Sequence, residues 1–386
     1  MGVVRKILDD EQGMVLVITL LILALLLGAG VGAIVSTQTD LKTSSNLKTA
    51  TMAFYIAEAG VERAKSEISG STTFNSALAG ADGSKSNTSD NGILSFGSSV
   101  SFGGGTYAVS VTDNSDGDSD SWADADNKVY ISSTGTYGTS SRTIRVLVTK
   151  ASLGFNGAIN VVDDQCETEQ GGSATVTGLD YTYNPSNQNN PTRASGPDAH
   201  AIARSCTTNN DDITKPSQLT GVGSSTPDIT SDIGSLTLSS LQSTRSDLIA
   251  IADTTYNGTT TLSGTQTLGT RTSPQITYVN GSLKITGNVT GVGFLIVNED
   301  FEVTGNFTYE GIILIGICST CPGRIHGTGN AKIYGATILA NPTSSHSGES
   351  EIDDMTGNSA FYYSTYAIEM AIRRTFRNLA WQEISN

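Results

Sequence analysis

Four cysteines are the side chains of this 386-residue chain best suited to covalent chemistry, and they fall into two pairs. Cys166 and Cys206 lie in a polar central stretch, while only two residues separate Cys318 from Cys321. Cysteines form stable disulfides in an oxidising compartment. Four cysteines in such a polar chain are consistent with that environment. We expect Cys166 to pair with Cys206, and Cys318 to pair with Cys321 in a small loop.

The second pair also has a metal-binding alternative. Cys318-Ser-Thr-Cys321-Pro-Gly and His326 give the spacing C-x2-C-x4-H, which matches three ligands of a zinc knuckle. No fourth ligand stands at the expected spacing, although His346 could supply one. Thioredoxin-like redox chemistry needs a βαβ context that the sequence does not predict. The disulfide loop is the favoured interpretation, and zinc is the alternative.

An acidic segment over residues 113–126 could bind calcium. Its six carboxylates belong to Asp113, Asp116, Asp118, Asp120, Asp124 and Asp126. Calcium prefers hard oxygen ligands of this kind, but no frame offers both the glycine at position six and the glutamate at position twelve of an EF-hand. We favour a solvated acidic loop, with calcium as the only cofactor that the sequence leaves open.

Motifs for catalysis are missing from the sequence. The three histidines, His200, His326 and His346, stand in no nucleophile motif, and neither a Walker A loop nor a dinucleotide fingerprint occurs. A formal net charge of −15 argues against nonspecific binding to a phosphate backbone. We therefore expect a protein that is not an enzyme and does not bind nucleic acid.

The elements that position these residues start with an apolar run of 22 residues, Met14 to Val35. At about 1.5 Å per residue, a helix of this length crosses a hydrocarbon core of roughly 30 Å. Arg5 and Lys6 precede the run, and positive charge there keeps the N-terminus cytoplasmic. The run is too long for a secretory signal and no small-residue cleavage site follows it, so we expect one membrane span.

The local pattern resembles a type IV prepilin. A charged leader, then Gly13, then Met14 opening the apolar run is the arrangement that a prepilin peptidase cleaves after the glycine, with methylation of the new amine. Residues 46–65 resemble the N-terminal region of PilX-type minor pilins, most strongly in the Ala-Phe-x-x-Ala-Glu-Ala-Gly core from Ala53 to Gly60. The resemblance covers roughly residues 10–70 and implies processing between Gly13 and Met14.

One departure from bulk pilins is informative. They carry a glutamate as the fifth residue of the mature chain, where this chain has Ile18. A carboxylate buried in lipid needs a partner, so its absence removes a charge pair between subunits. PilX-type pilins share this lack, which fits a low-copy or tip-located subunit. The resemblance assigns Ile18, Phe54 and Glu58 to packing in the filament.

Beyond the span the helix should continue as an amphipathic one and end near Ser69-Gly70. Its apolar stripe consists of Leu47, Ala50, Phe54, Ala57, Val61, Ala64 and Ile68. Alternating residues then predict a β-meander, with strands at Thr106–Val111, Val129–Ile131 and Arg142–Thr149. This pattern is typical of a sheet that packs on the helix. Residues 151–232 are polar and irregular, and 236–252 predict a short helix.

The last third of the chain contains a repeat. Thr-Gly-Asn recurs at Thr286, Thr304, Thr328 and Thr356, in steps of 18, 24 and 28 residues, and apolar runs follow the first three copies. A near-regular period with Gly-Asn corners indicates a β-solenoid, and a large antiparallel sandwich is the alternative. Ser364 should cap a final helix that closes the solenoid, with Ile368, Ile372, Phe376 and Leu379 on its apolar stripe. Arg373, Arg374 and Arg377 lie off that stripe, as a solvated face or a contact for an acidic partner.

The sequence therefore predicts an α+β chain with a long N-terminal helix, a pilin-like sheet head, and a C-terminal β-solenoid with a capping helix. The expected segments are a leader (1–13), the pilin helix (14–69, spanning at 14–35), the meander head (70–150), an irregular disulfide-bearing region (151–257), the solenoid (258–363) and the capping helix (364–386).

The expected function is that of a minor pilin that helps initiate or cap a type IV pilus at its tip. A pilus-associated adhesin and a plain membrane-anchored envelope protein are the alternatives. Its partners would be other pilins, contacted through the N-terminal helix, and the prepilin peptidase. Its location would be the bacterial inner membrane before assembly and the extracellular pilus afterwards.

Overall fold

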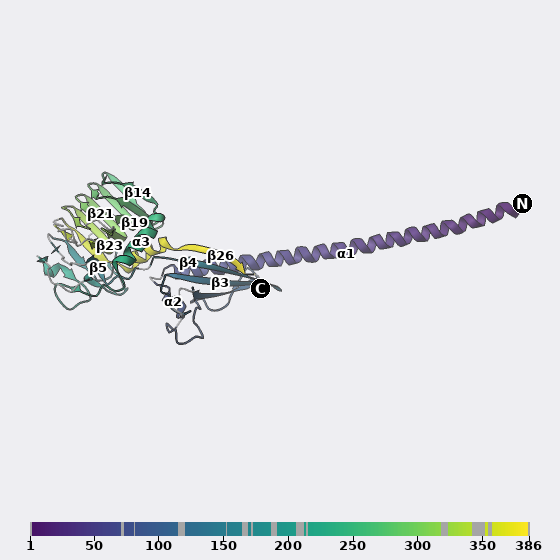
Figure 1. Cartoon of the computed structure of the whole chain (residues 1–386), viewed down its shortest axis with the longest axis horizontal. Coiled ribbons are helices and arrows are strands. Elements are labelled where there is room, and N and C mark those ends of the chain that lie inside the picture. The colour runs from purple at the N-terminus through teal and green to yellow at the C-terminus, as the bar shows by residue number, and fades with distance from the viewer. Residues whose placement is uncertain are drawn as a thin grey trace.

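The computed structural model of the chain describes residues 2–70, 73–80, 82–114, 120–151, 153–163, 169–170, 173–186, 191–205, 212–213, 215–317, 323–341, 352–353 and 357–384. Figure 1 shows a long helix, a small sheet packed against its C-terminal part, and a larger stack of strands further along the helix direction. The architecture is α+β, with the long apolar helix preceding mixed β-sheets.

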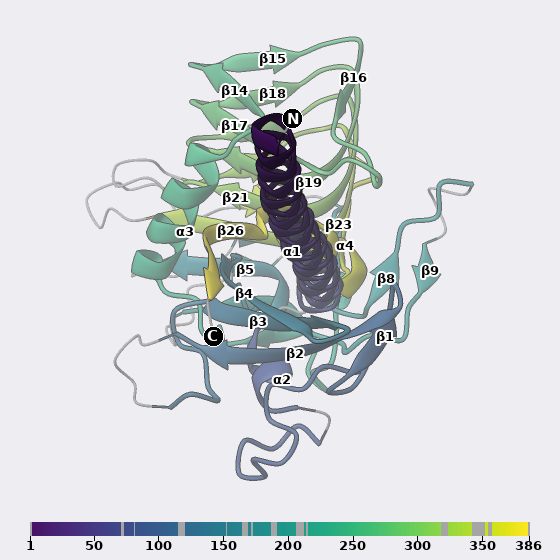
Figure 2. The ribbon, with the colours of Figure 1, turned by 90° about the vertical axis from the view of Figure 1, so that its right-hand side faces the viewer.

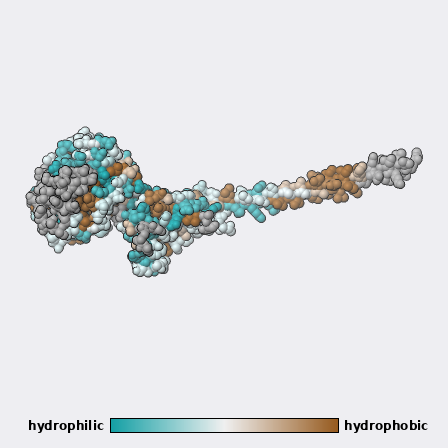
Figure 3. Space-filling view, in the orientation of Figure 1, coloured by the Kyte–Doolittle hydropathy of each residue, from teal (hydrophilic) through white to brown (hydrophobic). Residues whose placement is uncertain are grey.

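The helix α1 (Gly2–Ile68) is continuous over 67 residues. Its large apolar side chains between Met14 and Val35 are half or more exposed, and Figure 3 shows them as a hydrophobic sleeve on the free part of the rod. By length and composition, α1 is the one helix among the described residues that could cross a membrane. No other described element of the chain packs on these side chains, so their apolar surface is available to lipid or to neighbouring helices.

A five-stranded sheet, which we call the head, packs on the C-terminal part of α1. Its strands are β1 (Val100–Phe102), β2 (Gly105–Asp113), β3 (Lys128–Tyr137), β4 (Ser140–Thr149) and β26 (Arg377–Ile384), all paired antiparallel in the order β1-β2-β3-β4-β26. The three strands expected from alternation lie within β2, β3 and β4. A short helix, α2 (Asn75–Leu78), adds the buried Leu78 to this core.

The buried face of α1 differs from the predicted stripe at its beginning. Ala57, Val61, Ala64 and Ile68 are buried as expected, but Leu47 is 68% exposed. The head first reaches the helix near Thr49, whose hydroxyl lies 2.8 Å from the Ser140 hydroxyl. Residues before that point are exposed in the single chain because no described sheet extends over them.

The prediction of a helix over 364–386 is wrong in its second half. The helix α4 (Thr365–Thr375) begins as expected, since the Ser364 hydroxyl accepts a hydrogen bond from the Ala367 N–H at 3.3 Å. It ends before Phe376, and the following residues form β26 on the edge of β4, so Leu379 belongs to a strand. The open edge of β4 offers a row of backbone partners, and that pairing outweighs the helical spacing of the side chains.

The described residues between 157 and 363 form two sheets, each built of parallel strands, and the chain alternates between them. We call this unit the stack. The larger sheet contains β5 (Gly157–Asp163), β7 (Thr175–Thr177), β10 (His200–Arg204), β12 (Leu219–Thr220), β13 (Ile229–Thr230), β14 (Thr254–Asn257), β16 (Thr265–Leu268), β17 (Gln275–Asn280), β19 (Asn288–Val297), β21 (Asn306–Ile315), β23 (Asn330–Asn341) and β25 (Ala360–Tyr363). The smaller contains β6 (Glu169–Gln170), β11 (Asp212–Ile213), β15 (Thr260–Leu262), β18 (Leu283–Ile285), β20 (Phe301–Val303), β22 (Ile325–His326) and β24 (Ile352–Asp353). Figure 2 shows the layers stacked one above another, with the hairpin of β8 (Tyr181–Thr182) and β9 (Thr192–Arg193) projecting from one side.

The Thr-Gly-Asn repeats stack in register. Asn288 pairs with Asn306 and Asn306 with Asn330, although the steps in sequence are 18 and 24 residues, so the register is kept across steps of different length. The last copy is in register too, since Lys332 pairs with Ala360. The glycines at the bends of the long strands are also in register. Gly311 is an example: its φ is +143°, and an added Cβ would collide with the Gly293 carbonyl of the layer below.

The expectation that residues 151–257 are irregular is wrong. β5 pairs parallel with both β10 and β23, and β7 pairs with β25, so this region adds layers to the stack. Its strands are short and pair with segments far away in sequence, which leaves little local periodicity to detect. The predicted helix at 236–252 corresponds to α3 (Leu238–Ala250), capped by the Thr237 side chain. A single 3-10 turn, η1 (Pro216–Gln218), precedes β12.

Candidate functional site

The motif from Ala53 to Gly60 forms the seam between α1 and the head. An added Cβ on Gly135 of β3 would collide with the Ala53 carbonyl and the Ala57 amide, and one on Gly60 would collide with Ser133. Ala53 and Ala57 are fully buried. The small residues of the motif therefore let the helix backbone approach the sheet backbone closely.

Phe54 and Glu58, which the resemblance assigned to filament packing, lie beside this seam and are half-buried. The Phe54 ring lies edge-on to Trp381 of β26, with centroids 6.0 Å apart, and Tyr55 is 58% exposed next to it. Phe54 thus contacts its own head, while Tyr55 and the half-exposed Trp381 extend the apolar surface outward. Contacts with other subunits lie outside a single chain.

Gly28, Gly30 and Gly32 mark the part of the span where another helix could approach most closely. No heavy atom lies within 4 Å of a Cβ placed on any of them. Ile18, at the position of the missing carboxylate, is 50% exposed on the same rod. This arrangement offers neighbouring helices a close backbone contact without a charge.

Lys150 holds the end of α1 at the junction of head and stack. Its ammonium is buried, donates to the Ile68 carbonyl at 3.0 Å, and lies 4.1 Å from the centroid of the Phe74 ring. A cation at a helix C-terminus interacts favourably with the helix dipole. Burial nevertheless lowers the pKa of Lys150 to about 8, partly countered by Asp124 and Glu369.

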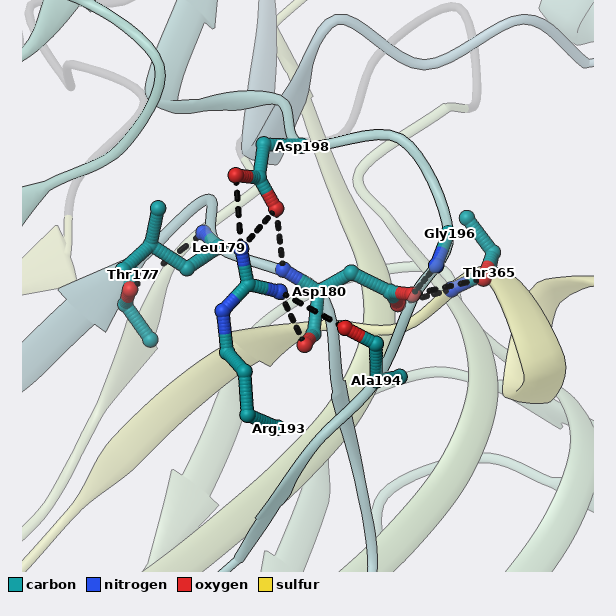
Figure 4. Close-up of polar contacts among 8 residues, drawn as sticks. All are labelled: Thr177, Leu179, Asp180, Arg193, Ala194, Gly196, Asp198 and Thr365. Atoms are coloured by element: carbon teal, nitrogen blue, oxygen red, sulfur yellow. Dashed lines mark hydrogen bonds and ion pairs between the residues drawn. The ribbon is translucent and has the colours of Figure 1, made fainter.

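A buried aspartate ties α4 to the side of the stack. Asp180 accepts hydrogen bonds from the Gly196 amide at 2.8 Å, the Thr365 amide at 2.9 Å and the Thr365 hydroxyl at 3.0 Å (Figure 4). Arg193 donates to the Asp180 carbonyl at 2.6 Å and pairs with both oxygens of Asp198. The negative charge of this carboxylate at the first turn of α4 also interacts favourably with the helix dipole. The base of the β8–β9 hairpin is thereby fixed to α4.

An ion pair and stacked tyrosines fill the space under α4. Arg271 reaches Glu310 at 2.7 Å, and Glu310 is only 4% exposed. Burial raises the pKa of the Glu310 carboxyl, and Arg271 opposes this rise. Tyr334 and Tyr362 stack with centroids 4.9 Å apart. Tyr334 also packs against Ala367 and Met370 of α4, and this contact holds the helix on the stack.

The arginines after Ser364, expected to face solvent or an acidic partner, make contacts within the chain. Arg374 pairs with Asp253 of the stack, and Arg377 lies 3.8 Å from Asp247 of α3. The Arg373 guanidinium lies against Gly70, just after α1. These contacts link α1, α3, α4 and the stack.

The predicted disulfides and the zinc alternative cannot be placed, because Cys166, Cys206, Cys318, Cys321 and His346 lie outside the described residues. His326 is half-buried in β22. In the described ranges, no group of three or more His, Cys, Asp or Glu side chains is arranged to hold a metal ion.

The acidic segment is described only in part, since Asp116 and Asp118 lie outside the described residues. Asp120 pairs with Lys85 at 2.7 Å, and Asp126 pairs with Lys128 at 2.7 Å. Asp113 is buried, and burial raises the pKa of Asp124. Two of the possible calcium ligands thus have lysine partners within the chain.

Sequence reasoning missed Lys150, Asp180 and Glu310. Each is a single charged residue in a stretch without a motif, and each acquires its role through partners that are distant in sequence. No local signal could have identified them.

A family model described as PilX N-terminal matches residues 12–62. Residues 12–62 are a PilX N-terminal domain, the N-terminal region of a type IV pilin. The match begins next to Gly13 and ends two residues beyond the seam with the head. In this chain, the matched residues therefore comprise the apolar run and most of the surface of α1 that carries the head.

The crystal structure of the competence-associated pilin ComZ from Thermus thermophilus is similar to this chain with a TM-score of 0.28 and 11% identity, over 87% of this chain and 98% of that chain. A similarity at this TM-score carries no argument about fold or function. No curated protein matches the sequence.

Proposed function

We propose that this pilin is a non-catalytic minor subunit that initiates or caps a type IV pilus at its tip. The main support is the position of the stack, which lies beyond the C-terminal end of α1, further along the direction in which the helix runs (Figures 1 and 2). Subunits whose N-terminal helices pack side by side rise along the filament axis, so the stack would occupy space that the next subunit needs. A subunit at the tip of the filament has no subunit above it and avoids this conflict.

Ile18 supports the same placement. A subunit within the shaft would use a carboxylate there to pair with a neighbour's terminal amine, as the resemblance to pilins implies. An apolar side chain in lipid needs no such partner. A subunit that makes one charge pair fewer suits a low-copy position better than the repeating shaft.

The stack is inferred to be a β-solenoid, because its parallel layers share one register and each long strand bends at an equivalent glycine. We infer that prepilin peptidase cleaves between Gly13 and Met14, that α1 anchors the chain in the inner membrane with the N-terminus cytoplasmic, and that other pilins then receive it through this helix.

The experiment is immunogold labelling of native filaments with antibody against the stack, together with the N-terminal mass of the exported chain. The proposal requires gold at one filament end and a mature chain that starts at Met14. Regular labelling along the shaft would refute the tip position. A chain that keeps residues 1–13 would indicate a plain membrane-anchored protein instead.

Adhesion is a second candidate function, favoured by the outward position of the stack and by a polar groove on its surface. A strain that lacks only the stack separates the two roles. Filaments that persist without attaching to a surface would indicate adhesion, and filaments that disappear would indicate assembly.

A further inference from the structure

A groove of about 450 Å³ crosses successive layers of the stack. It is lined by Asn288, Val289, Thr290, Asn306, Thr308, Asn330, Lys332 and Asn358. Because strands in a sheet lie about 4.8 Å apart, these side chains repeat at that spacing along the stack. The groove thus presents a periodic surface to solvent.

Two rows of side chains form the groove. One row contains asparagines 288, 306, 330 and 358, all exposed, and the other contains Thr290, Thr308 and Lys332, which are in register with one another. Asn306 donates to the Asn288 amide oxygen at 2.7 Å, and Asn330 donates to Asn306 at 2.9 Å. Each of these amides uses one N–H in the row, and an amide nitrogen has two. The second N–H of each remains for a ligand.

The charge of the groove is unlike that of the chain. The formal net charge of the protein is −15, yet no carboxylate lines the groove, and its one ionisable side chain is Lys332. Lys332 is half-buried, and its ammonium lies 3.5 Å from the Asn358 amide oxygen, at the limit of a hydrogen bond. Burial lowers the pKa of Lys332. This ammonium is poorly compensated and well placed to donate to an incoming oxygen.

We propose that this groove binds an extended neutral polysaccharide, whose hydroxyl groups bond to the asparagine amides, the threonine hydroxyls and Lys332. Hydroxyl groups both donate and accept, as do the side chains of both rows. A straight groove along the layers favours an extended chain over a coiled one. A nucleic acid would bring several phosphates to a single lysine on an acidic protein, which is electrostatically unfavourable.

The test is calorimetric titration of the detergent-solubilised full chain with cellohexaose and with chitohexaose, which are extended β-1,4-linked probes. Thr290→Glu places a bulky charge in the groove, and Thr261→Glu places the same charge on another face, at an equally exposed threonine of β15. We expect at least one sugar to bind, Thr290→Glu to weaken binding at least about tenfold, and Thr261→Glu to change it less than about twofold.

Thermal unfolding of both variants checks that neither substitution disrupts the stack. Failure of both hexasaccharides to bind at millimolar concentration would overturn the proposal, as would equal losses in the two variants. Binding of duplex DNA or polygalacturonate in their place would overturn it as well. The titration requires no filament, so failure here leaves the tip position intact, and failure of the tip position leaves sugar binding intact.

Discussion

Small residues and one buried lysine determine how α1 meets the rest of the molecule. At the seam, Gly135 and Gly60 have no side chain where the backbones of α1 and the sheet come closest. At the end of the helix, Lys150 binds the Ile68 carbonyl. The first contact depends on the absence of atoms and the second on a charge, so they respond to different perturbations.

Gly135→Ala should destabilise the head, because the new Cβ collides with the backbone of α1 at Ala53 and Ala57. Overpacking of this kind costs about 1–3 kcal/mol. Thermal unfolding of the solubilised chain measures it. Gly154→Ala is the matched control, since the nearest atom to its Cβ is the Ser235 hydroxyl at 3.1 Å. Equal melting temperatures for the two variants would contradict the seam.

Lys150→Met should remove a pH dependence of stability. The pKa of Lys150 is about 8 in the folded chain and 10.5 when unfolded, so between these values the unfolded chain binds more protons. The free energy of unfolding of the native chain therefore rises with pH in this window, by up to about 3 kcal/mol. Denaturant titrations at pH 7, 9 and 10.5 should show this rise for the native chain relative to Lys150→Met. Parallel profiles would mean that Lys150 is solvated.

Among the elements, α4 and β26 connect the parts of the molecule. α4 packs over β19, β21 and β23 through Tyr334, Ala367 and Met370, and the chain passes from it directly into the edge of the head sheet. Asp180 fixes the start of α4, and Arg374 ties its last turn to Asp253. Movement of the stack relative to the head must therefore displace α4.

Asp180→Asn should loosen α4 without changing the shape of the side chain. All three groups that contact the Asp180 carboxylate are donors, and an amide can offer them only one acceptor oxygen. An unsatisfied buried group costs about 1–3 kcal/mol. Hydrogen exchange should become faster in α4, while Asp232→Asn, an exposed control, should leave it unchanged. Unchanged protection in Asp180→Asn would contradict this role.

At the scale of the whole molecule, the stack is an insertion in the head. It leaves after β4 and returns before β26, and these strands are neighbours, with Thr149 paired to Arg377. At the junction, the Ala151 amide donates to the Thr375 hydroxyl at 2.8 Å. Two separate hydrophobic cores, one inside the stack and one between the head and α1, match this division.

Replacement of residues 152–375 by a short glycine-serine linker should therefore leave a folded head. Its strands would keep their pairing, because the linker need only join two adjacent strand ends. Circular dichroism and cooperative unfolding of the solubilised variant measure this. The same deletion with β26 also removed is the comparison, and it should unfold at a lower temperature. Loss of cooperative unfolding in the first variant would show that the head needs the stack.

The sequence predicted those features that depend on local pattern. Fourteen Leu, Ile and Val residues between Met14 and Val35 require an apolar environment. The repeated Thr-Gly-Asn motif, with its asparagines at 288 and 306, predicted the register of the layers. The strand β26 and the layers built from 157–230 escaped prediction because they are specified by distant partners. Gly135 was equally invisible, since its importance lies in the helix backbone opposite it.

The insertion between β4 and β26 decides how tension would travel through the molecule. A pull on the stack, resisted at the membrane end of α1, enters the head through two adjacent strands at once. These two strands are hydrogen-bonded to each other, and β4 is also paired with β3, so the load reaches a paired edge of the sheet. The stack is thus joined to the rest of the molecule by two chain connections into paired strands, where a terminal domain would hang from a single loop.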